Sequence, residues 1–215
     1  MTTAPANSRT CQELAGAGVA TVYEAYGRRG LLDVDLIPIT PGRRAAGPAR
    51  IALCGQDDNR AVHEVMAHLQ PGEVLVLTMP EATPVALVGD LLATQAVARG
   101  AAAVLVNAAV RDSAELAAFD VPLWARWRRS KGATKTVRGS IDVAVTIGGT
   151  QISPGDVIVL DDDGAVAVAA SDVDSVLVAV AERLTKEQGL RRRWAAGELS
   201  YDAYGLRAED EETQP

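Results

Sequence analysis

The sequence predicts a mixed α/β protein, and two patterns carry that prediction. Strand-like apolar runs alternate with helix-like segments between residues 49 and 106, which is typical of a parallel sheet covered by helices. After residue 122 the apolar runs are short and are separated by turn dipeptides, which favours antiparallel hairpins. No linker-like stretch divides the two parts, so we expect one domain over residues 1–207.

The N-terminal segment, up to about residue 30, is expected to be one helix. Thr10 can cap it, and a loose apolar stripe follows at Leu14, Val19, Val22 and Tyr26. Residues 27–47 are punctuated by prolines and glycines and are expected to form a loop. The alternating part then gives a strand at 49–54, a helix at 59–69, a strand at 73–78, a helix at 87–99 and a strand at 103–106.

The second part is expected to contain short strands followed by helices. Asp161-Asp162-Asp163-Gly164 lacks the ligand spacing of a calcium loop, so we interpret it as a hairpin turn. We expect strands at 123–125, 141–147, 157–160 and 165–169, helices at 171–195 and 200–204, and an acidic disordered tail at 208–215.

Composition excludes several classes of protein. Of the 215 residues, 48% are hydrophobic and 23% are charged, which excludes wholesale disorder, and no apolar run is as long as a transmembrane helix. The net charge of −7 argues against nucleic acid and anionic membranes as partners. Residues 1–10 are polar, unlike a secretory signal peptide, and two cysteines cannot build a disulfide framework. We therefore expect a cytoplasmic protein.

The segment from Gly89 to Asp112 carries the clearest chemistry. Gly89 and Asp90 open a helix, and the unpaired N–H groups at such an end, together with the helix dipole, favour a bound carboxylate or phosphate. Twenty residues separate Asp90 from Arg111, which Asp112 follows directly. Because ligands of parallel α/β units bind where strands end and helices begin, this segment can bring a helix end, a guanidinium and two carboxylates together. A surface ion pair is the competing interpretation.

These residues resemble the RraA-like superfamily, and most closely its 4-hydroxy-4-methyl-2-oxoglutarate / 4-carboxy-4-hydroxy-2-oxoadipate aldolases. The resemblance extends from about residue 12 to Arg207. Its motifs are Gly89-Asp90-Leu91-Leu92-Ala93 and Arg111-Asp112, with Gly30-Leu31-Leu32-Asp33, Asp58-Asn59 before His63, Gly139-Ser140-Ile141-Asp142-Val143, Pro154-Gly155-Asp156 and Ala196-Gly197-Glu198-Leu199.

The resemblance implies a layered α/β/β domain of the swivelling type with a C-terminal helical extension, assembled as a homotrimer or homohexamer. It also implies a lyase that cleaves a 4-hydroxy-2-oxo di- or tricarboxylic acid to pyruvate and decarboxylates oxaloacetate. Both reactions leave a pyruvate enolate, which Mg²⁺ or Mn²⁺ stabilises as a Lewis acid and a guanidinium stabilises by hydrogen bonds.

The resemblance also assigns roles to residues of this chain. Asp112 would bind the metal and Asp90 a metal-bound water, while Arg111 would contact the pyruvyl group. Glu198 would reach the metal through water from a neighbouring subunit. The substrate would be bound by Gly89, by the N–H groups of Leu91 and Leu92, by Asn59 and by Arg111.

The lysines argue independently against an imine-forming aldolase. None of Lys131, Lys135 and Lys186 lies in an apolar strand, where loss of water would lower the pKa of the amine. His63, a lone helical histidine, is either a packing or surface residue or a supporting residue of the site. His68 has no role that the sequence indicates.

Two stretches depart from the aldolases and leave the substrate open. Residues 107–109 are Asn-Ala-Ala, where the aldolases usually have an acid and a glycine and the regulators of the superfamily often have Asn and Gly. Between Trp124 and Gly132 the chain is basic, where the aldolases tend to have small or neutral residues. A solvated or subunit-contacting strand edge, a polyacid-binding site and an RNA-binding surface are the three interpretations of this run.

Two alternatives to the aldolase remain. One is a non-enzymatic regulator that binds a ribonuclease, which the asparagine at position 107 weakly favours, although such a protein would not need Asp90, Arg111 and Asp112. The other is a relative of the aldolases recruited to a specialised biosynthetic pathway. No glycine-rich loop for S-adenosylmethionine follows the first expected strand, so a methyltransferase is not indicated.

Overall fold

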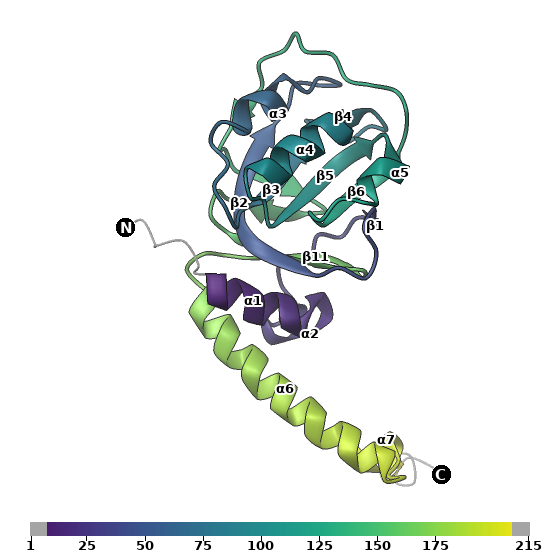
Figure 1. Cartoon of the computed structure of the whole chain (residues 1–215). Coiled ribbons are helices and arrows are strands. Elements are labelled where there is room, and N and C mark those ends of the chain that lie inside the picture. The colour runs from purple at the N-terminus through teal and green to yellow at the C-terminus, as the bar shows by residue number, and fades with distance from the viewer. Residues whose placement is uncertain (1–7, 208–215) are drawn as a thin grey trace, which may run out of the picture.

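A parallel sheet lies at the centre of the molecule, in a computed structural model that describes residues 8–207 (Figure 1). In it, β3 (Val74–Thr78) lies between β2 (Ala45–Leu53) and β5 (Ala103–Val110), and β6 (Leu123–Arg128) pairs with the other side of β5. Every residue of β3 and β5 is buried, as expected for strands that are covered on both faces. The predicted parallel arrangement is confirmed.

Helices α3 (Arg60–Val65), α4 (Asp90–Ala98) and α5 (Ser113–Leu116) cover one face of this sheet (Figure 1). Their apolar side chains pack with those of the strands into one buried cluster, which includes Leu77 and Leu92. The helices follow the carboxyl ends of their strands, so the polar residues at those junctions lie along one edge of the sheet.

A second, antiparallel layer lies on the other face. The N-terminal half of β2 continues into it and pairs with β10 (Val157–Asp161), which forms a hairpin with β11 (Gly164–Val168). The largest side chain between the layers is the fully buried Trp124, whose indole N–H donates to the carbonyl of Asp161 at 2.9 Å. The smaller strands are β1 (Ile37–Pro38), β4 (Ala86–Val88), β7 (Ser140–Ile141), β8 (Val145–Ile147) and β9 (Thr150–Ile152).

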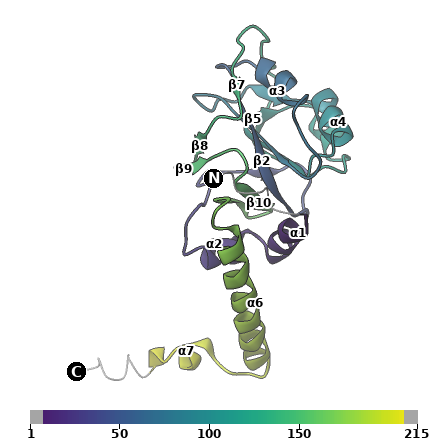
Figure 2. The ribbon, with the colours of Figure 1, turned by 90° about the vertical axis from the view of Figure 1, so that its left-hand side faces the viewer.

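Helices α1 (Ser8–Ala17), α2 (Val19–Ala25) and the start of α6 (Val173–Ala195) cover the outer face of the antiparallel layer. Only Val173, Val176 and Val180 of α6 are buried, so the rest of this helix projects away from the body as an arm that ends in α7 (Ser200–Ala203) (Figures 1 and 2). The layered α/β/β fold and its helical extension are therefore as the resemblance implies.

The prediction of one long N-terminal helix is wrong. The chain breaks into α1 and α2 at Gly18, whose φ of 85° is unfavourable for other residues. The break lets the backbone N–H of Val19 donate to the Asp161 carboxylate at 2.8 Å. Thr10 lies inside α1 and does not cap it, and the expected loop at 27–47 contains β1 and the start of β2.

Several other boundaries differ from the prediction: the helix expected at 59–69 is α3 and ends at Val65, and the strand expected at 123–125 is β6 and continues to Arg128. The expected helix at 87–99 begins only at Asp90, because residues 86–88 form β4 and pair with β5. The strand expected at 103–106 continues to Val110 beside that new neighbour. The expected strand at 141–147 is two strands, because β7 pairs with β2 while β8 pairs with β9.

The hairpin turn predicted at residues 161–164 joins β10 to β11. Within residues 8–207 no helix combines the length and the apolar composition needed to cross a lipid bilayer. The acidic tail predicted at 208–215 lies outside the described residues.

Candidate functional site

Two short junctions meet at the carboxyl edge of the parallel sheet. Gly89 joins β4 to α4, and Arg111 and Asp112 join β5 to α5. The backbone N–H of Arg111 donates to the carbonyl of Val88 at 3.0 Å, which extends the pairing of β4 with β5 by one residue. The register of the two strands therefore places the start of α4 directly against Arg111 and Asp112.

Gly89 is required by space rather than by backbone conformation. Its φ of −132° and ψ of −169° are extended and open to any residue. A β-carbon at this position would lie 2.4 Å from Oδ2 of Asp112 and 3.1 Å from Cγ and Nε of Arg111. Only a glycine lets the carboxylate and the guanidinium approach the helix end this closely.

Asp112 is held at the centre of the site by its backbone and by two neighbours. Its φ of 57° and ψ of 45° lie in the left-handed region, which Asp and Asn tolerate better than most side chains. Oδ2 accepts the backbone N–H of Asp90 at 3.2 Å and lies 3.6 Å from Nε of Arg111. The carboxylate thus faces both the positive end of α4 and a cation, and its side chain remains 35% exposed.

Arg111 is flanked by a second glycine. A β-carbon at Gly132 would lie 3.0 Å from Nη1 of Arg111, so the chain makes room for the guanidinium on that side too. The side chain is 51% exposed and forms its ion pair with the adjacent Asp112. Its other donors are consequently available to an anionic ligand.

A pocket of about 120 Å³ opens between α3 and the start of α4. Asn59 lines it and is only 7% exposed. Its Nδ2 donates to the carbonyl of Leu87 at 3.0 Å, while its Oδ1 has no hydrogen-bond partner among the described residues. A buried acceptor without a donor is costly, so the pocket is suited to a ligand or water that donates a hydrogen bond. The pocket is lined by Asn59, His63, residues 86–92, Arg111, Ala133 and Lys135.

Residues 131–138, which we call the strap, contribute Ala133 and Lys135 to the lining of the pocket, and the fully buried Asp58 holds this segment by hydrogen bonds. Oδ2 of Asp58 accepts the Thr134 hydroxyl and the Thr136 N–H, both at 2.6 Å, and the Val137 N–H at 3.1 Å. Burial by itself raises the pKa of this carboxyl, but the hydrogen bonds from Thr134, Arg60, Thr136 and Val137 outweigh it and the pKa is lowered. Asp58 therefore stays ionised and fixes the strap in place.

His63 and Lys135 supply the polar groups at the mouth of the pocket. Partial burial and the charge of Lys135 lower the pKa of the imidazole, so His63 is neutral at pH 7. Lys135 is exposed, which leaves its amine hydrated.

The start of α4 only partly matches the expected cradle. The Leu91 N–H donates to Oδ1 of Asp90 at 2.7 Å, so this N–H is occupied by a side chain rather than open to a ligand. Leu92 turns its side chain into the core, while that of Leu91 is 78% exposed. The binding role of these two residues stays a prediction.

Asp90 and Asp112, the two carboxylates expected to hold a metal within one chain, both lie at this edge of the sheet. No three His, Cys, Asp or Glu side chains within residues 8–207 lie close enough to hold a metal together. Carboxylate oxygens are the ligands that Mg²⁺ prefers, and this ion usually keeps several waters and takes only one or two carboxylates. The donor set therefore fits a hydrated Mg²⁺ and does not fit a closed, all-protein metal site.

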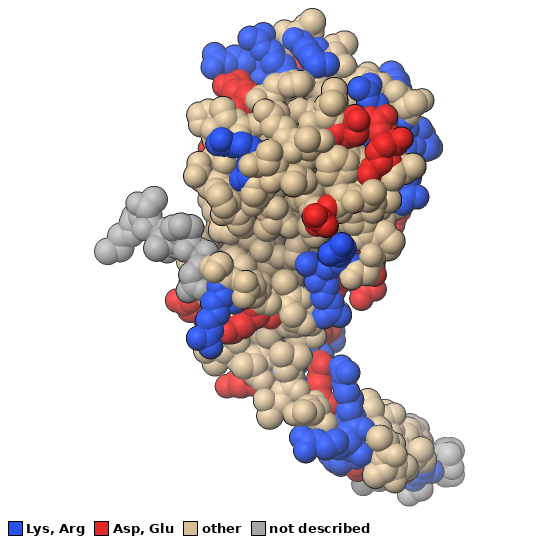
Figure 3. Space-filling view, viewed as in Figure 1, with Lys and Arg blue, Asp and Glu red and all other residues tan. Residues whose placement is uncertain are grey.

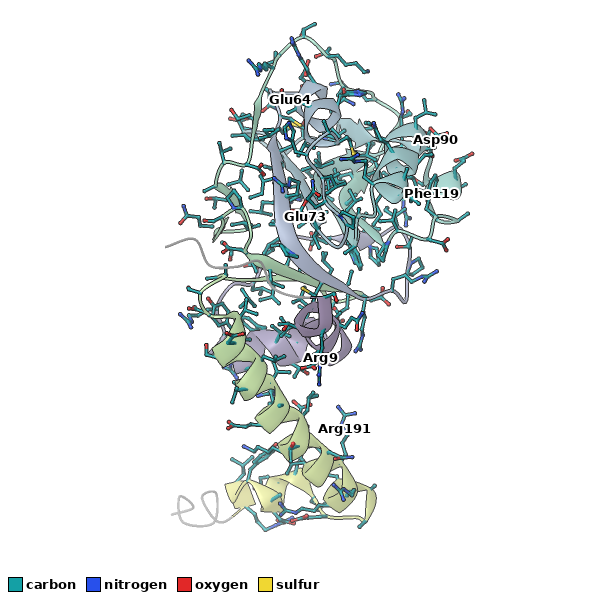
Figure 4. The ribbon with its side chains drawn as sticks, turned by 60° about the vertical axis from the view of Figure 1, so that its left-hand side comes forward. Arg9, Glu64, Glu73, Asp90, Phe119 and Arg191 are labelled. Atoms are coloured by element: carbon teal, nitrogen blue, oxygen red, sulfur yellow. The ribbon has the colours of Figure 1, made fainter. Side chains whose placement is uncertain are left out.

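Glu198, the third expected acid, lies at the far end of the arm, where its carboxylate pairs with Arg193. Asp90 and Arg191, a residue of the outer part of α6, are at opposite ends of the molecule in Figure 4. Within one chain the structure does not bring Glu198 to the site, and its role in a neighbouring subunit stays a prediction.

Asn107 lies outside the site. It is 6% exposed within β5, and its Nδ2 donates to Oγ1 of Thr78 in the neighbouring β3 at 3.0 Å. The sheet thus explains the amide nitrogen of Asn107, while its buried Oδ1 has no hydrogen-bond partner among the described residues.

Sequence reasoning missed Asp58, Gly132 and the strap. The contacts of Asp58 join residues that are 76 to 79 positions apart, which no local pattern reveals. The available signal was the pair Asp58-Asn59 directly before an expected helix, together with a glycine inside the polar run that follows Trp127.

Comparisons with known proteins identify a family that this chain matches. The family model described as RraA-like, Aldolase/RraA, matches residues 19–167. A Halalkalibacterium halodurans protein named "Putative 4-hydroxy-4-methyl-2-oxoglutarate aldolase" is 29% identical over 167 residues, which are 78% of this chain and 80% of that protein.

Two solved structures are also similar. Streptomyces coelicolor RraAS2, described as an unusual member of the RNase ES inhibitor RraA protein family, is 26% identical, with a TM-score of 0.76 over 87% of this chain and 98% of that chain. A Geobacillus kaustophilus protein described as S-adenosylmethionine:2-dimethylmenaquinone methyltransferase is 29% identical, with a TM-score of 0.65 over 70% of this chain and 93% of that chain.

Proposed function

Because this chain belongs to the RraA-like (Aldolase/RraA) family, we propose that it is a divalent-metal-dependent aldolase. Its substrate is a 4-hydroxy-2-oxo acid with two or three carboxylates, which it cleaves to pyruvate, and it also decarboxylates oxaloacetate. The observation that carries this proposal is the approach of Arg111 and Asp112 to the start of α4 across Gly89. A protein without chemistry at this edge has no need for a carboxylate and a guanidinium packed against a glycine.

The reaction breaks the C3–C4 bond of the substrate and leaves its electron pair on the pyruvyl fragment as an enolate. The hydroxyl at C4 loses its proton to water and becomes the carbonyl of the second product, and the enolate takes up a proton from water at C3 to give pyruvate. Arg111, with free N–H donors beside the pocket, binds the pyruvyl carboxylate or carbonyl oxygen and stabilises the negative charge that develops there. The positive end of α4 adds to this stabilisation.

Asp112 would hold the divalent cation, and Asp90 would hold a water bound to that cation. When bound, Mg²⁺ or Mn²⁺ supplies Lewis acidity toward the 2-oxo oxygen. Asp112 is suited to this role because it is fixed by its backbone, by the Asp90 N–H and by Arg111, yet it keeps an exposed face. Lys135, the lysine that lines the pocket, is exposed, which argues against imine formation there.

Asn59 orients the substrate. Its unpaired Oδ1 is a buried acceptor in the pocket wall, and the substrate carries a hydroxyl that can donate to it. Glu198 of a neighbouring subunit, carried on the projecting arm, would complete the site in a trimer or hexamer. Arg111, Asp90 and Asp112 of a single chain form the minimal catalytic unit in this proposal.

The test measures the release of pyruvate from oxaloacetate and from 4-hydroxy-4-methyl-2-oxoglutarate. Lactate dehydrogenase reduces the pyruvate, and the consumption of NADH reports the rate. Mg²⁺ or Mn²⁺ should support turnover, a chelator should stop it, and added metal should restore it. Asp112→Asn, which keeps a side chain that tolerates the left-handed backbone, should lower kcat at least a hundredfold and weaken binding of Mn²⁺.

Asp120→Asn is the matched control, because Asp120 is an exposed carboxylate outside the pocket and its loss should change neither rate nor metal affinity. Equal turnover by the wild-type protein and Asp112→Asn would remove Asp112 from the mechanism. No turnover with any metal would refute the aldolase.

The second candidate is a regulator that binds a ribonuclease, and the similarity to the Streptomyces protein along 87% of this chain favours it. In that case the protein should slow cleavage of RNA by its ribonuclease, and Asp112→Asn should leave that inhibition unchanged. A relative recruited to a specialised pathway would show metal-dependent chemistry but no pyruvate from either test substrate. The methyltransferase activity named for the Geobacillus protein finds no support in this chain. A site for S-adenosylmethionine would need a glycine-rich loop after the first strand, and the loop after β2 has a single glycine, Gly55.

A further inference from the structure

A second hollow lies beside the pocket, on the other side of Arg111. It has a volume of about 500 Å³ and opens widely to solvent. Its lining combines three guanidinium groups, two hydroxyls and one carboxylate, from Arg111, Asp112, Ser113, Arg128, Arg129 and Ser130. Figure 3 shows basic side chains next to acidic ones on this side of the molecule, around α5.

The sheet itself brings these residues together. In the parallel pair of β5 and β6, Val110 lies opposite Arg128, and the backbone N–H of Arg129 donates to the carbonyl of Val110 at 2.9 Å. The residues that follow each strand therefore emerge next to each other at the same edge. The hollow is thus positioned by strand register, as the pocket is.

Two of the three guanidinium groups of the hollow, those of Arg128 and Arg129, lack acidic partners among the described residues. Nη2 of Arg128 contacts the carbonyl of Pro38 at 3.4 Å, and Nη1 of Arg129 contacts the carbonyl of Arg128 at 2.8 Å. No carboxylate of residues 8–207 forms an ion pair with either side chain, and the single carboxylate in the lining, Asp112, already pairs with Arg111. The hollow is consequently a positively charged surface inside a chain whose net charge is −7.

Arg111 lines both the pocket and the hollow. A ligand whose pyruvyl end is bound by Arg111 can place its other end in the hollow, where the donors of Arg128 and Arg129 and the hydroxyls of Ser113 and Ser130 face it. In an aldol substrate that other end is a substituent of C4, while the C4 hydroxyl stays in the pocket at Asn59.

We propose that Arg128 and Arg129 bind an additional carboxylate on the C4 side of the substrate and make the enzyme selective for tricarboxylic over dicarboxylic aldols. The proposal rests on the proposed function, because it needs the pyruvyl end at Arg111. The selectivity arises from charge-assisted hydrogen bonds that only the third carboxylate can accept.

Two substrates that differ by one carboxylate test the proposal. In 4-carboxy-4-hydroxy-2-oxoadipate the methyl group of 4-hydroxy-4-methyl-2-oxoglutarate carries an extra carboxylate. The ratio of their kcat/KM values should favour the tricarboxylate in the wild-type protein, and each of Arg128→Ala and Arg129→Ala should lower that ratio roughly tenfold. The kcat/KM for the dicarboxylate should change by less than about threefold, because the pocket and Asp112 are untouched.

Arg9→Ala is the matched control, because Arg9 is an exposed arginine on α1, at the far side of the body from Asp90 in Figure 4. It should leave the ratio unchanged. Circular dichroism spectra and thermal unfolding of each variant should match those of the wild-type protein, since the side chains of Arg128 and Arg129 are exposed.

Equilibrium binding of tricarballylate and glutarate, measured by calorimetry, separates this proposal from the aldolase itself. If neither aldol is cleaved but tricarballylate binds more tightly than glutarate and loses that advantage in the double variant Arg128→Ala/Arg129→Ala, the aldolase fails and the carboxylate site stands. An unchanged ratio in all variants, with normal turnover, overturns the carboxylate site and leaves the aldolase. Binding of single-stranded RNA that the double variant abolishes, with the ratio unchanged, also overturns it and assigns the hollow to RNA.

Discussion

Substituting Gly89 by alanine tests whether the site depends on the close approach of Asp112 to the helix end. The new β-carbon would lie 2.4 Å from Oδ2 of Asp112, whereas a carbon–oxygen contact is comfortable at about 3.3 Å. The carboxylate must therefore move by roughly 1 Å, and a displacement of that size at a reacting centre can lower the rate by about a hundredfold. Arg111 must shift less, because the β-carbon would lie 3.1 Å from its Cγ and Nε.

Stability should change far less than activity. Alanine accepts the extended backbone at position 89, and the atom it meets most closely is the end of a side chain that can rotate. Loss of glycine restricts the unfolded chain, while alanine is a poorer helix cap, so the free energy of unfolding should stay within about 1 kcal/mol of the wild-type value. The expected result is a folded protein with kcat/KM for pyruvate release about a hundredfold lower and with weakened Mn²⁺ binding.

Gly189→Ala is the control for this experiment. Gly189 lies inside α6, and a β-carbon added there would meet no heavy atom within 4 Å, so the change should leave activity intact and stabilise the helix by up to about 1 kcal/mol. The assay couples pyruvate to lactate dehydrogenase, with urea unfolding measured on the same samples. If Gly89→Ala keeps kcat/KM within threefold of the wild-type value, the approach of Asp112 to the helix end is not part of catalysis.

Three further changes probe other parts of the structure. Arg111→Lys should lower kcat/KM at least a hundredfold, because a point charge cannot reproduce paired guanidinium hydrogen bonds, and a near-normal rate would exclude Arg111 from substrate binding. Asp58→Asn should lower the free energy of unfolding at pH 7 by about 2–4 kcal/mol, because an amide has only one acceptor oxygen, whereas Oδ1 of Asp58 accepts the Arg60 N–H and Oδ2 accepts the donors of the strap; Asp120→Asn should leave it unchanged. The pKa of Asp58 is lowered on folding, so the stabilisation that its carboxylate provides is present above the ordinary pKa of Asp, about 4, and is lost as the pH falls through the folded-state pKa. Urea unfolding should therefore show a smaller difference in free energy between the wild-type protein and Asp58→Asn at pH 3 than at pH 7. A difference that does not change with pH would contradict the role of the ionised carboxylate. Trp124→Phe should cost about 1–2 kcal/mol, measured by urea unfolding, because the buried carbonyl of Asp161 loses its donor, and an unchanged value would show that water replaces the indole.

The alternation of strands and helices was predictable because the buried strands are continuous apolar runs. β3 and β5 are covered on both faces, and their sequences show it without any partner being known. β4 was not predictable, since its three residues continue directly into Gly89 and a helix and become a strand only by pairing with β5. At the break at Gly18, the N–H of Val19 likewise pairs with Asp161, which lies 142 positions further along the chain.

Some features of the candidate site were likewise predictable from the sequence and others were not. The meeting of Gly89, Arg111 and Asp112 was one of two interpretations that the spacing allowed, because the carboxyl ends of parallel strands share one edge. The spacing alone did not exclude a surface ion pair, and the pairing of β4 with β5 that brings the two junctions together was not predictable. The strap and its anchor Asp58 depend on contacts between distant segments, and the sequence shows only a polar run. The position of Glu198 relative to a neighbouring site depends on an assembly that one chain does not contain.

Two independent requirements limit which residues can replace Asp112. A replacement must provide an oxygen ligand if the chemistry is to survive, and it must also tolerate a φ of 57° if the turn into α5 is to survive. Branched and bulky residues fail the second requirement whether or not the first still matters. A relative of this protein that has lost its activity but kept its fold is therefore expected to have asparagine or glycine in place of Asp112. Substitution at this single position would then indicate that the activity has been lost.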